Sequence, residues 1–279
     1  LNNDWVPNGG MENFGSAYLP ATHQATLLRA KGAPVDNIAP ADPASVQALK
    51  LAALARENAD FAEAAADAQA IRAAIGNYET AFRMQAILPQ LADVANEPRH
   101  VQASYGIGSS DPHQNYYAIQ ALRARRLVEA GVRLVTVDCR WWDTHVEGID
   151  SMRNGFLPRW DQCYPALIND LERRGLLDRV MVVAWGEFGR TPVVNATNGR
   201  DHYPNVFSAA LAGGPVQGGR VVGASDSKGA LPLDNPKTPQ DVLATIYHHM
   251  GIDTTKQYRD FSGRPIPILP FGEPIHELM

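Results

Sequence analysis

The sequence predicts an α/β protein built on a parallel sheet, and three observations support this prediction. Two apolar runs, Val132–Val137 and Val180–Trp185, are rich in β-branched residues and have the length of buried strands. A helix-like segment, Pro158–Arg174, lies between them and is closed by Gly175. Strand, helix and strand in this order are typical of a right-handed βαβ unit, in which the two strands are parallel.

A helical region precedes this unit. Asp42 and Pro43 have the residue types of a helix N-cap and first helical position. The residues that follow are rich in Ala, Leu, Glu, Gln and Arg, which favour long helices, with Gly76 as a point where the helix can be interrupted. We interpret residues 43–96 as a helical insertion within a single domain that covers residues 1–279.

The remaining elements follow from local signals. Helices are expected at 113–130 and at 238–250, the second beginning with a capping-box pattern. The apolar stretch Val206–Ala212 is expected to be a third strand or a short buried segment, and Arg220–Gly223 a short strand. The Arg-rich stretch 123–126 is expected to lie on a solvated helix face.

The composition narrows the class of protein. A net charge of -5 over 279 residues argues against a nucleic-acid partner or an anionic membrane surface. No apolar run approaches the roughly 20 residues that a transmembrane helix needs, so no transmembrane segment is expected. Two cysteines exclude a disulfide framework and a Cys-rich zinc site, although a single Cys139–Cys163 bridge remains open. The oligomeric state is not fixed by any of these features.

Acidic and imidazole side chains gather after both predicted strands. Asp143 and His145 follow the first strand, Glu187 follows the second, and Asp201 and His202 come shortly afterwards. Ligands of open α/β sheets bind beyond the carboxyl ends of the strands, so we expect these five side chains to lie together. Mixed Asp, Glu and His sets suit Zn, Mn, Fe, Mg or Ca. The sequence therefore predicts a site for divalent metal ions.

Two arginines, Arg190 and Arg200, accompany these residues. A guanidinium group beside a metal can hold a tetrahedral oxyanion such as phosphate or sulfate. Alternatively, the arginines form salt bridges that orient the acidic groups, and both interpretations remain open. No phosphate-binding glycine loop and no Gly-x-Ser-x-Gly elbow is present. The dinucleotide-binding glycine fingerprint is also absent, which argues against a nucleotide-binding dehydrogenase.

Three stretches have the character of family motifs, Trp142–His145, Gly186–Pro192 and Gly199–Pro204. They resemble the signature motifs of the bacterial domain-of-unknown-function 1501 (DUF1501) family, within the alkaline phosphatase-like superfamily of phosphatases and sulfatases. The resemblance extends over essentially the whole chain. It implies a three-layer α/β/α sandwich around a mostly parallel sheet, with two divalent metal ions and hydrolysis of phosphate or sulfate esters.

The same resemblance implies roles for single residues. Asp143, His145 and His202 would be metal ligands, with Glu187 and Asp201 as ligands or as groups supporting them. Family members also have an N-terminal portion with an early Asp ligand and the nucleophile, so this chain is expected to be a C-terminal portion of the fold.

Two functions are therefore expected. The first is a metal-dependent hydrolase of small-molecule or saccharide phosphate or sulfate esters. The alternative is a non-catalytic metal- or ligand-binding relative with the same fold. The family resemblance also favours an exported protein.

Overall fold

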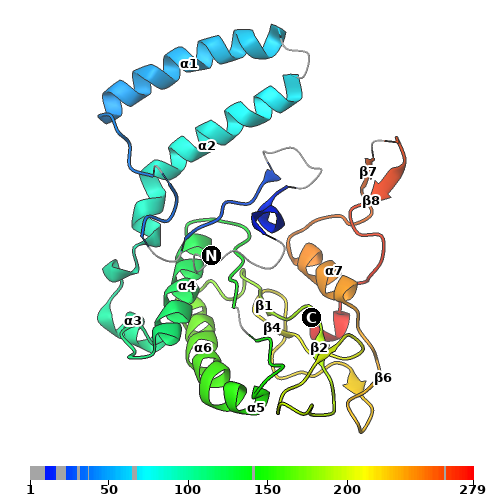
Figure 1. Ribbon diagram of the computed structural model, residues 1–279. Coiled ribbons are helices and arrows are strands. Elements are labelled where there is room, and N and C mark those ends of the chain that lie inside the picture. The colour runs from blue at the N-terminus through cyan, green and yellow to red at the C-terminus, as the bar shows by residue number, and fades with distance from the viewer. Residues whose placement is uncertain are drawn as a thin grey trace. The chain divides into compact units, whose positions relative to one another are not determined.

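The computed structural model describes residues 10–16, 23–29, 32–36, 38–64, 68–139, 142–260 and 262–279. The chain forms two compact units, Leu1–Cys139 and Arg140–Met279 (Figure 1).

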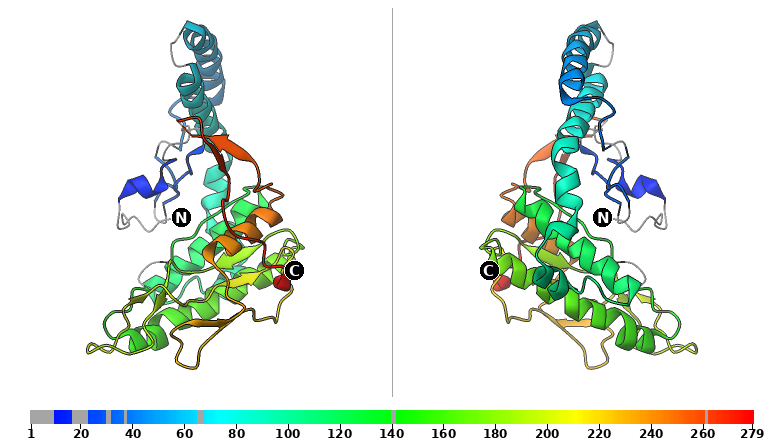
Figure 2. Two further views of the ribbon diagram at one scale, coloured as in Figure 1. Left: turned by 90° about the vertical axis from the view of Figure 1, so that its right-hand side faces the viewer. Right: turned by 90° about the vertical axis from the view of Figure 1, so that its left-hand side faces the viewer.

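The first unit begins its regular structure with a helical hairpin. Helices α1 (Ala44–Ala64) and α2 (Ala68–Ala92) run antiparallel, as Figures 1 and 2 show from three directions. Gln47 of α1 donates to Gln85 of α2 over 2.8 Å, which joins the start of one helix to the later part of the other. Alanine has the highest helix propensity, and α2 continues through Gly76 without interruption.

The core of the first unit lies around α4 (Pro112–Glu129), which packs against α2 and α3 (Arg99–Tyr105). Tyr105 is completely buried there. Arg125 is only 1% exposed and pairs with Glu97 over 2.7 Å, so the prediction of a solvated face is wrong at this arginine. An ion pair makes the burial of a guanidinium group tolerable, because a buried charge without a partner is strongly unfavourable. Among its described residues the unit also contains two short 3-10 helices, η1 (Met11–Phe14) and η3 (Val94–Asn96).

The described part of the second unit contains one long helical rod and a separate helix. The rod consists of α5 (Gly148–Ser151), the π-helical turn η4 (Met152–Phe156) and α6 (Leu157–Arg173). It ends where Gly175 takes a left-handed conformation, as its sequence position predicts. Helix α7 (Pro239–His249) begins with the predicted capping box, in which Thr238 and Asp241 bond reciprocally. These two predicted helices are confirmed. A 3-10 turn, η5 (His276–Leu278), lies near the end of the chain.

The strands of the second unit are short and antiparallel. Among the described residues they form four two-stranded ladders: β1 (Val182–Ala184) with β4 (Ala210–Ala212), β2 (Gly189–Arg190) with β3 (His202–Tyr203), β5 (Ala224–Ser225) with β6 (Pro232–Asp234), and β7 (Gln257–Arg259) with β8 (Pro265–Pro267). The predicted α/β fold, a three-layer α/β/α sandwich with a mostly parallel sheet, is therefore wrong.

The error lies in the first predicted strand. The run Val132–Val137 belongs to no ladder, whereas the second run does form β1 but pairs with β4. A strand of a parallel sheet is buried on both faces, but the residue Leu134 is 69% exposed. The preference of β-branched residues for strands depends on packing against cross-strand neighbours. The described ladders provide no such neighbours for this run.

Two further features concern the whole described chain. In the residues that can be described, no helix is both long and apolar enough to span a bilayer. Cys139 is exposed and Cys163 is buried, and the described residues contain no disulfide between them, although the sequence left that bridge open.

Candidate metal centre

The β2–β3 ladder sets one side of the candidate site. Arg190 of β2 lies directly opposite His202 of β3. Side chains of residues directly opposite each other in an antiparallel pair lie on the same face, within reach of one another. The ladder therefore fixes the spacing between this guanidinium group and this imidazole.

The other side of the site is the segment that contains Asp143 and His145, and it is bound to the loop before β3. Arg200 donates its backbone N–H to the carbonyl of Thr144 over 2.9 Å. Gly199 packs so closely that a Cβ atom there would lie 2.0 Å from the carbonyl oxygen of His145. Only glycine permits this approach, because it has no side chain.

Stacked aromatic rings support the same segment. The ring of Trp142, the residue before Asp143, stacks on Phe156 of the π-helical turn with centroids 5.3 Å apart. The ring of Trp160 lies edge-on to that of Trp142, with ring centroids 6.1 Å apart. These contacts limit the positions that the backbone of Asp143 can take.

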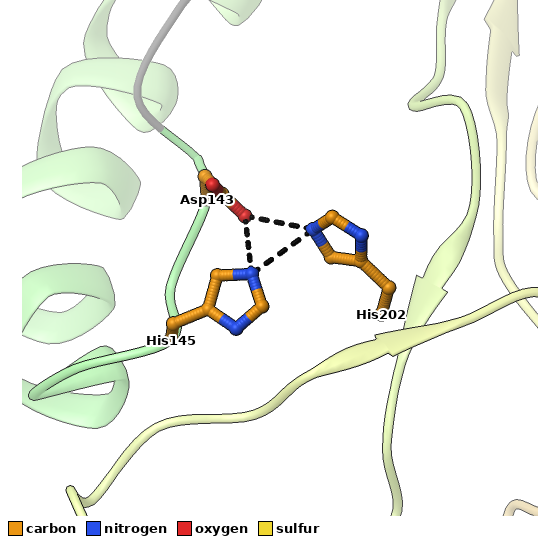
Figure 3. Close-up of side chains that lie close together, drawn as sticks. All are labelled: Asp143, His145 and His202. Carbon is orange, nitrogen blue, oxygen red and sulfur yellow. Dashed lines mark hydrogen bonds and ion pairs between the residues drawn. The ribbon is translucent and has the colours of Figure 1, made fainter.

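Three potential ligand atoms converge between the two sides, as Figure 3 shows. Asp143 Oδ1 lies 3.1 Å from His145 Nε2 and 3.1 Å from His202 Nε2. The two imidazole nitrogens are 3.0 Å apart. The side chains are 59%, 38% and 50% exposed, in the order Asp143, His145 and His202, so the group is open to solvent.

The spacing of these atoms fits one metal ion. Two ligand atoms that are each about 2.1 Å from a metal and at right angles to each other, as in octahedral coordination, are separated by about 3.0 Å. All three separations in the group agree with that value. The arrangement would leave the side facing solvent open for water or another ligand.

Asp201 determines how His145 presents its nitrogens. Its Oδ1 atom lies 2.7 Å from His145 Nδ1. Hydrogen bonds from His145 and Asn195 hold the pKa of Asp201 below its ordinary value, so its carboxylate accepts and does not donate. His145 Nδ1 can therefore donate to Asp201, and Nε2 is the nitrogen that faces Asp143 and His202. This carboxylate–imidazole pair is the arrangement that commonly orients metal-binding histidines.

Arg190 binds the same oxygen of Asp143 that faces both histidines. Its Nη2 lies 2.8 Å from Asp143 Oδ1. Burial raises the pKa of Asp143, but the hydrogen bonds from His202 and Arg190 outweigh this effect and hold the pKa below its ordinary value. The carboxylate is therefore ionised at neutral pH. Phe188 packs between these groups, with its ring centre 4.3 Å from that of His202 and 5.9 Å from the Arg190 guanidinium carbon.

Four of the seven predicted site residues lie outside the group of three ligand atoms, and two of these, Arg190 and Asp201, adjoin it. Arg200 donates through Nη1 to the carbonyls of Thr191 and Pro192, both at 2.6 Å, and so holds the loop after β2. Glu187 is exposed in the segment between β1 and β2 and does not belong to the group. Asp201 adjoins the group through His145.

Sequence reasoning missed Asn195. Its side chain bonds to Asp201, to the His145 carbonyl and to the turn that follows it. The available signal was the run from Asn195 to Gly199, because Asn followed by Gly at short spacing is typical of a side-chain-stabilised turn. Phe188 lies within the stretch Gly186–Pro192, but no role was predicted for its side chain.

Comparison with known proteins gives one result for the whole chain. A family model described as "Protein of unknown function (DUF1501)" matches residues 3–279. No curated protein and no solved structure matches the chain.

Proposed function

We propose that this chain, which belongs to the DUF1501 family, binds a divalent metal ion through Asp143, His145 and His202 and hydrolyses phosphate or sulfate esters. The observation that supports this most is the convergence of one carboxylate oxygen and two imidazole nitrogens at 3.0–3.1 Å. Asp201 behind His145 and Arg190 beside Asp143 add the supporting groups that such a centre needs.

The ligand chemistry favours a transition metal. Imidazole nitrogen suits Zn, Fe and Mn, whereas Ca and Mg prefer sites made only of oxygen ligands. A group with two imidazoles and one carboxylate therefore fits Zn, Mn or Fe better than Ca or Mg. When bound, the metal would act as a Lewis acid on an ester oxygen or on water.

The chain's own residues would bind and orient the substrate. Arg190 can turn its guanidinium group toward the nonbridging oxygens of a phosphate or sulfate group, for which its planar fork is suited. Asp201 binds His145 Nδ1, which leaves His145 Nε2 as the nitrogen that would face the metal. Because the group of ligand atoms is exposed to solvent, a small-molecule or saccharide ester can reach it without a conformational change.

The kinship with alkaline phosphatase-like enzymes is part of this proposal, and it is based on the three motifs alone. We adopt the hydrolytic chemistry of these enzymes but not their three-layer fold, since the described strands are antiparallel pairs. A fold does not determine a reaction, and a hydrolytic site can occur on different folds.

One observation favours a second candidate, a metal-binding relative without turnover. Arg190 is already paired with Asp143 Oδ1, the atom that the metal would also need. If this ion pair persists in the metal-bound protein, the guanidinium group is not available to hold an ester.

Metal content and ester hydrolysis test both candidates. The purified protein is loaded with Zn²⁺ or Mn²⁺ and analysed beside His202→Ala, with His248→Ala as the matched control for loss of an imidazole. We expect near-stoichiometric metal in the parent and in His248→Ala, and at least about a tenfold loss of affinity in His202→Ala. Equal binding in all three proteins would contradict the site. Metal binding without hydrolysis of aryl phosphates or sulfates would select the second candidate.

A further inference from the structure

An aromatic ring lies on the same face of the β2–β3 ladder as the guanidinium group and one candidate ligand. Phe188 comes directly before β2, two residues from Arg190. Side chains two residues apart in an extended chain share a face. Arg190 is directly opposite His202 in the register, which adds the imidazole to this face. The ladder therefore presents an apolar group, a cation and a possible metal ligand side by side.

The contacts of Phe188 agree with this placement. Its ring centre lies 4.3 Å from that of His202, with the two planes tilted by 42°. The guanidinium carbon of Arg190 is 5.9 Å from the same ring centre. Phe188 is half-buried, so part of it remains accessible to solvent beside the exposed group of ligand atoms. An organic group attached to an oxyanion at Arg190 can therefore lie against this ring.

Two roles are open to such a ring. It can hold the imidazole and the guanidinium group in place, by ring contact and by cation–π attraction. It can also contact the organic part of a substrate, because binding sites combine apolar and aromatic side chains with a few polar groups that fix orientation. The first role affects every ligand of the site equally, whereas the second affects only ligands with an apolar part.

The first role is already filled by other contacts. The register of the ladder sets the backbones of Arg190 and His202 opposite each other. The ion pair of Arg190 with Asp143, at 2.8 Å, orients the guanidinium group. His202 Nε2 is 3.1 Å from the same Asp143 oxygen. These contacts favour the second role for the ring.

We propose that Phe188 is a specificity-determining residue whose ring contacts the organic part of an ester while Arg190 holds the oxyanion. The substrate class is then a phosphate or sulfate ester with a flat apolar surface next to the ester oxygen, such as an aryl group or the C–H face of a sugar ring. Inorganic phosphate and short alkyl esters lack this surface. The inference is based on the proposed function, because it assumes that Arg190 holds the oxyanion.

Three variants separate specificity from positioning. Phe188→Ala removes the ring. Phe188→Leu keeps an apolar side chain but loses the flat aromatic face. Phe271→Ala is the matched control, because it removes the same type of side chain from a position after β8 at which the residue is 74% exposed.

The deciding measurement is ligand affinity in the Zn²⁺- or Mn²⁺-loaded proteins, obtained by calorimetric titration. The ligands are inorganic phosphate, methylphosphonate, phenylphosphonate and a glucose-derived phosphonate, since an ester hydrolase does not cleave a P–C bond. We expect the parent and Phe271→Ala to bind the phenyl or the glucose compound about tenfold more tightly than methylphosphonate, because burial of about 60 Å² of apolar surface has this effect. The tighter of the two ring compounds identifies the kind of organic group.

Phe188→Ala should lose this preference and keep the parent's affinity for inorganic phosphate. Phe188→Leu should lose about threefold of the preference, the part due to the aromatic face. An unchanged preference in Phe188→Ala would overturn the proposal. An equal loss of affinity for all four ligands would also overturn it, because the ring would then only hold its neighbours. If Phe188→Ala does not fold, an unchanged preference in Phe188→Leu overturns the proposal in the same way.

Hydrolysis is measured separately, so that the two proposals can fail independently. A parent protein that binds the phosphonates but cleaves neither phenyl phosphate nor a sugar phosphate would refute the proposed hydrolysis, and the preference would still decide on Phe188. A parent protein that cleaves esters without preferring a ring compound over methylphosphonate would overturn only the role of Phe188.

Discussion

At the scale of single residues, Asp143 Oδ1 is the most crowded atom of the site. It lies within 3.1 Å of both imidazoles and 2.8 Å from Arg190. A guanidinium group and a metal ion are both cations, so they compete for this oxygen. Arg190, which would hold an oxyanion in the metal-loaded protein, is thus also the residue that pairs with Asp143 Oδ1 when no metal is bound.

This competition gives a prediction for Arg190→Gln. The variant should bind Zn²⁺ or Mn²⁺ at least as tightly as the parent, because Asp143 Oδ1 loses a competing partner. Its affinity for inorganic phosphate in the metal-loaded state should fall by about tenfold or more, since hydrogen bonds between charged groups are worth about 1.5–3 kcal/mol. Calorimetric titration measures both, with Arg190→Lys as the control that keeps the charge. Unchanged phosphate affinity in Arg190→Gln would exclude this role.

Gly199 allows a second prediction at this scale. In Gly199→Ala the new Cβ would meet the His145 carbonyl at 2.0 Å, so the loop or the ligand segment must move. We expect a loss of stability of about 2 kcal/mol or more, as for other overpacked sites, together with weaker metal binding. Gly218→Ala is the control, because nothing lies within 4 Å of its Cβ position. Denaturant unfolding of both variants is the measurement, and equal midpoints would contradict the close approach.

At the scale of elements, the sequence predicted helices well and the sheet badly. The capping box of α7 and the Gly175 stop after α6 are local signals, and local signals are sufficient to place a helix. A strand needs a partner from elsewhere in the chain, and nothing within Val132–Val137 states whether one exists. The pairing of β1 with β4 rather than with that run could not be read from either segment.

The candidate site was predictable in part for the same reason. Asp143 and His145 are near neighbours in sequence, as are Asp201 and His202, so each pair could be recognised as a possible metal-binding pair from the sequence alone. Placing Glu187 with them depended on strands that end at one edge of a parallel sheet, and that premise is removed by the antiparallel pairing. The contribution of Asn195 depends on a turn and a shared oxygen, which no residue type reveals alone.

The loop before α7 provides a prediction on pH. Lys237 and Asn235 both donate to Glu277 of η5, and they lower the pKa of Glu277 from 4.5 to about 2. A depressed pKa in the folded state stabilises the fold above the unfolded value and loses this effect as the pH falls from about 4.5 toward 2. Glu277→Gln should therefore be less stable than the parent at pH 7, and the difference should disappear near pH 2. Chemical denaturation at several pH values tests this, and a difference independent of pH would contradict it.

At the scale of the whole molecule, the residues of the candidate site all belong to the unit Arg140–Met279. A ligand that binds only the folded state stabilises it by about 2.7 kcal/mol at 100 times its dissociation constant. This stabilisation is expected in the unit that contains the ligand residues. The hairpin of α1 and α2 belongs to the other unit and has no residue in the site.

Hydrogen exchange can test this distribution. Addition of Zn²⁺ or Mn²⁺ should slow exchange in peptides that cover 143–148 and 189–203, and leave peptides from α1 and α2 unchanged. In His202→Ala, addition of the metal should not slow exchange in any of these peptides. Slower exchange in α1 and α2 of the parent would mean that the two units unfold together.

The distance between the two histidines along the chain has a consequence for the unfolded protein. His145 and His202 are 57 residues apart in sequence and 3.0 Å apart in space. An ion bound by both would close that stretch into a ring, as a disulfide does, and a ring of this size removes about 4 kcal/mol of chain entropy from the unfolded state. A metal ion bound at the candidate centre would therefore act as a removable cross-link. A chelator would open this cross-link, as a reductant opens a disulfide.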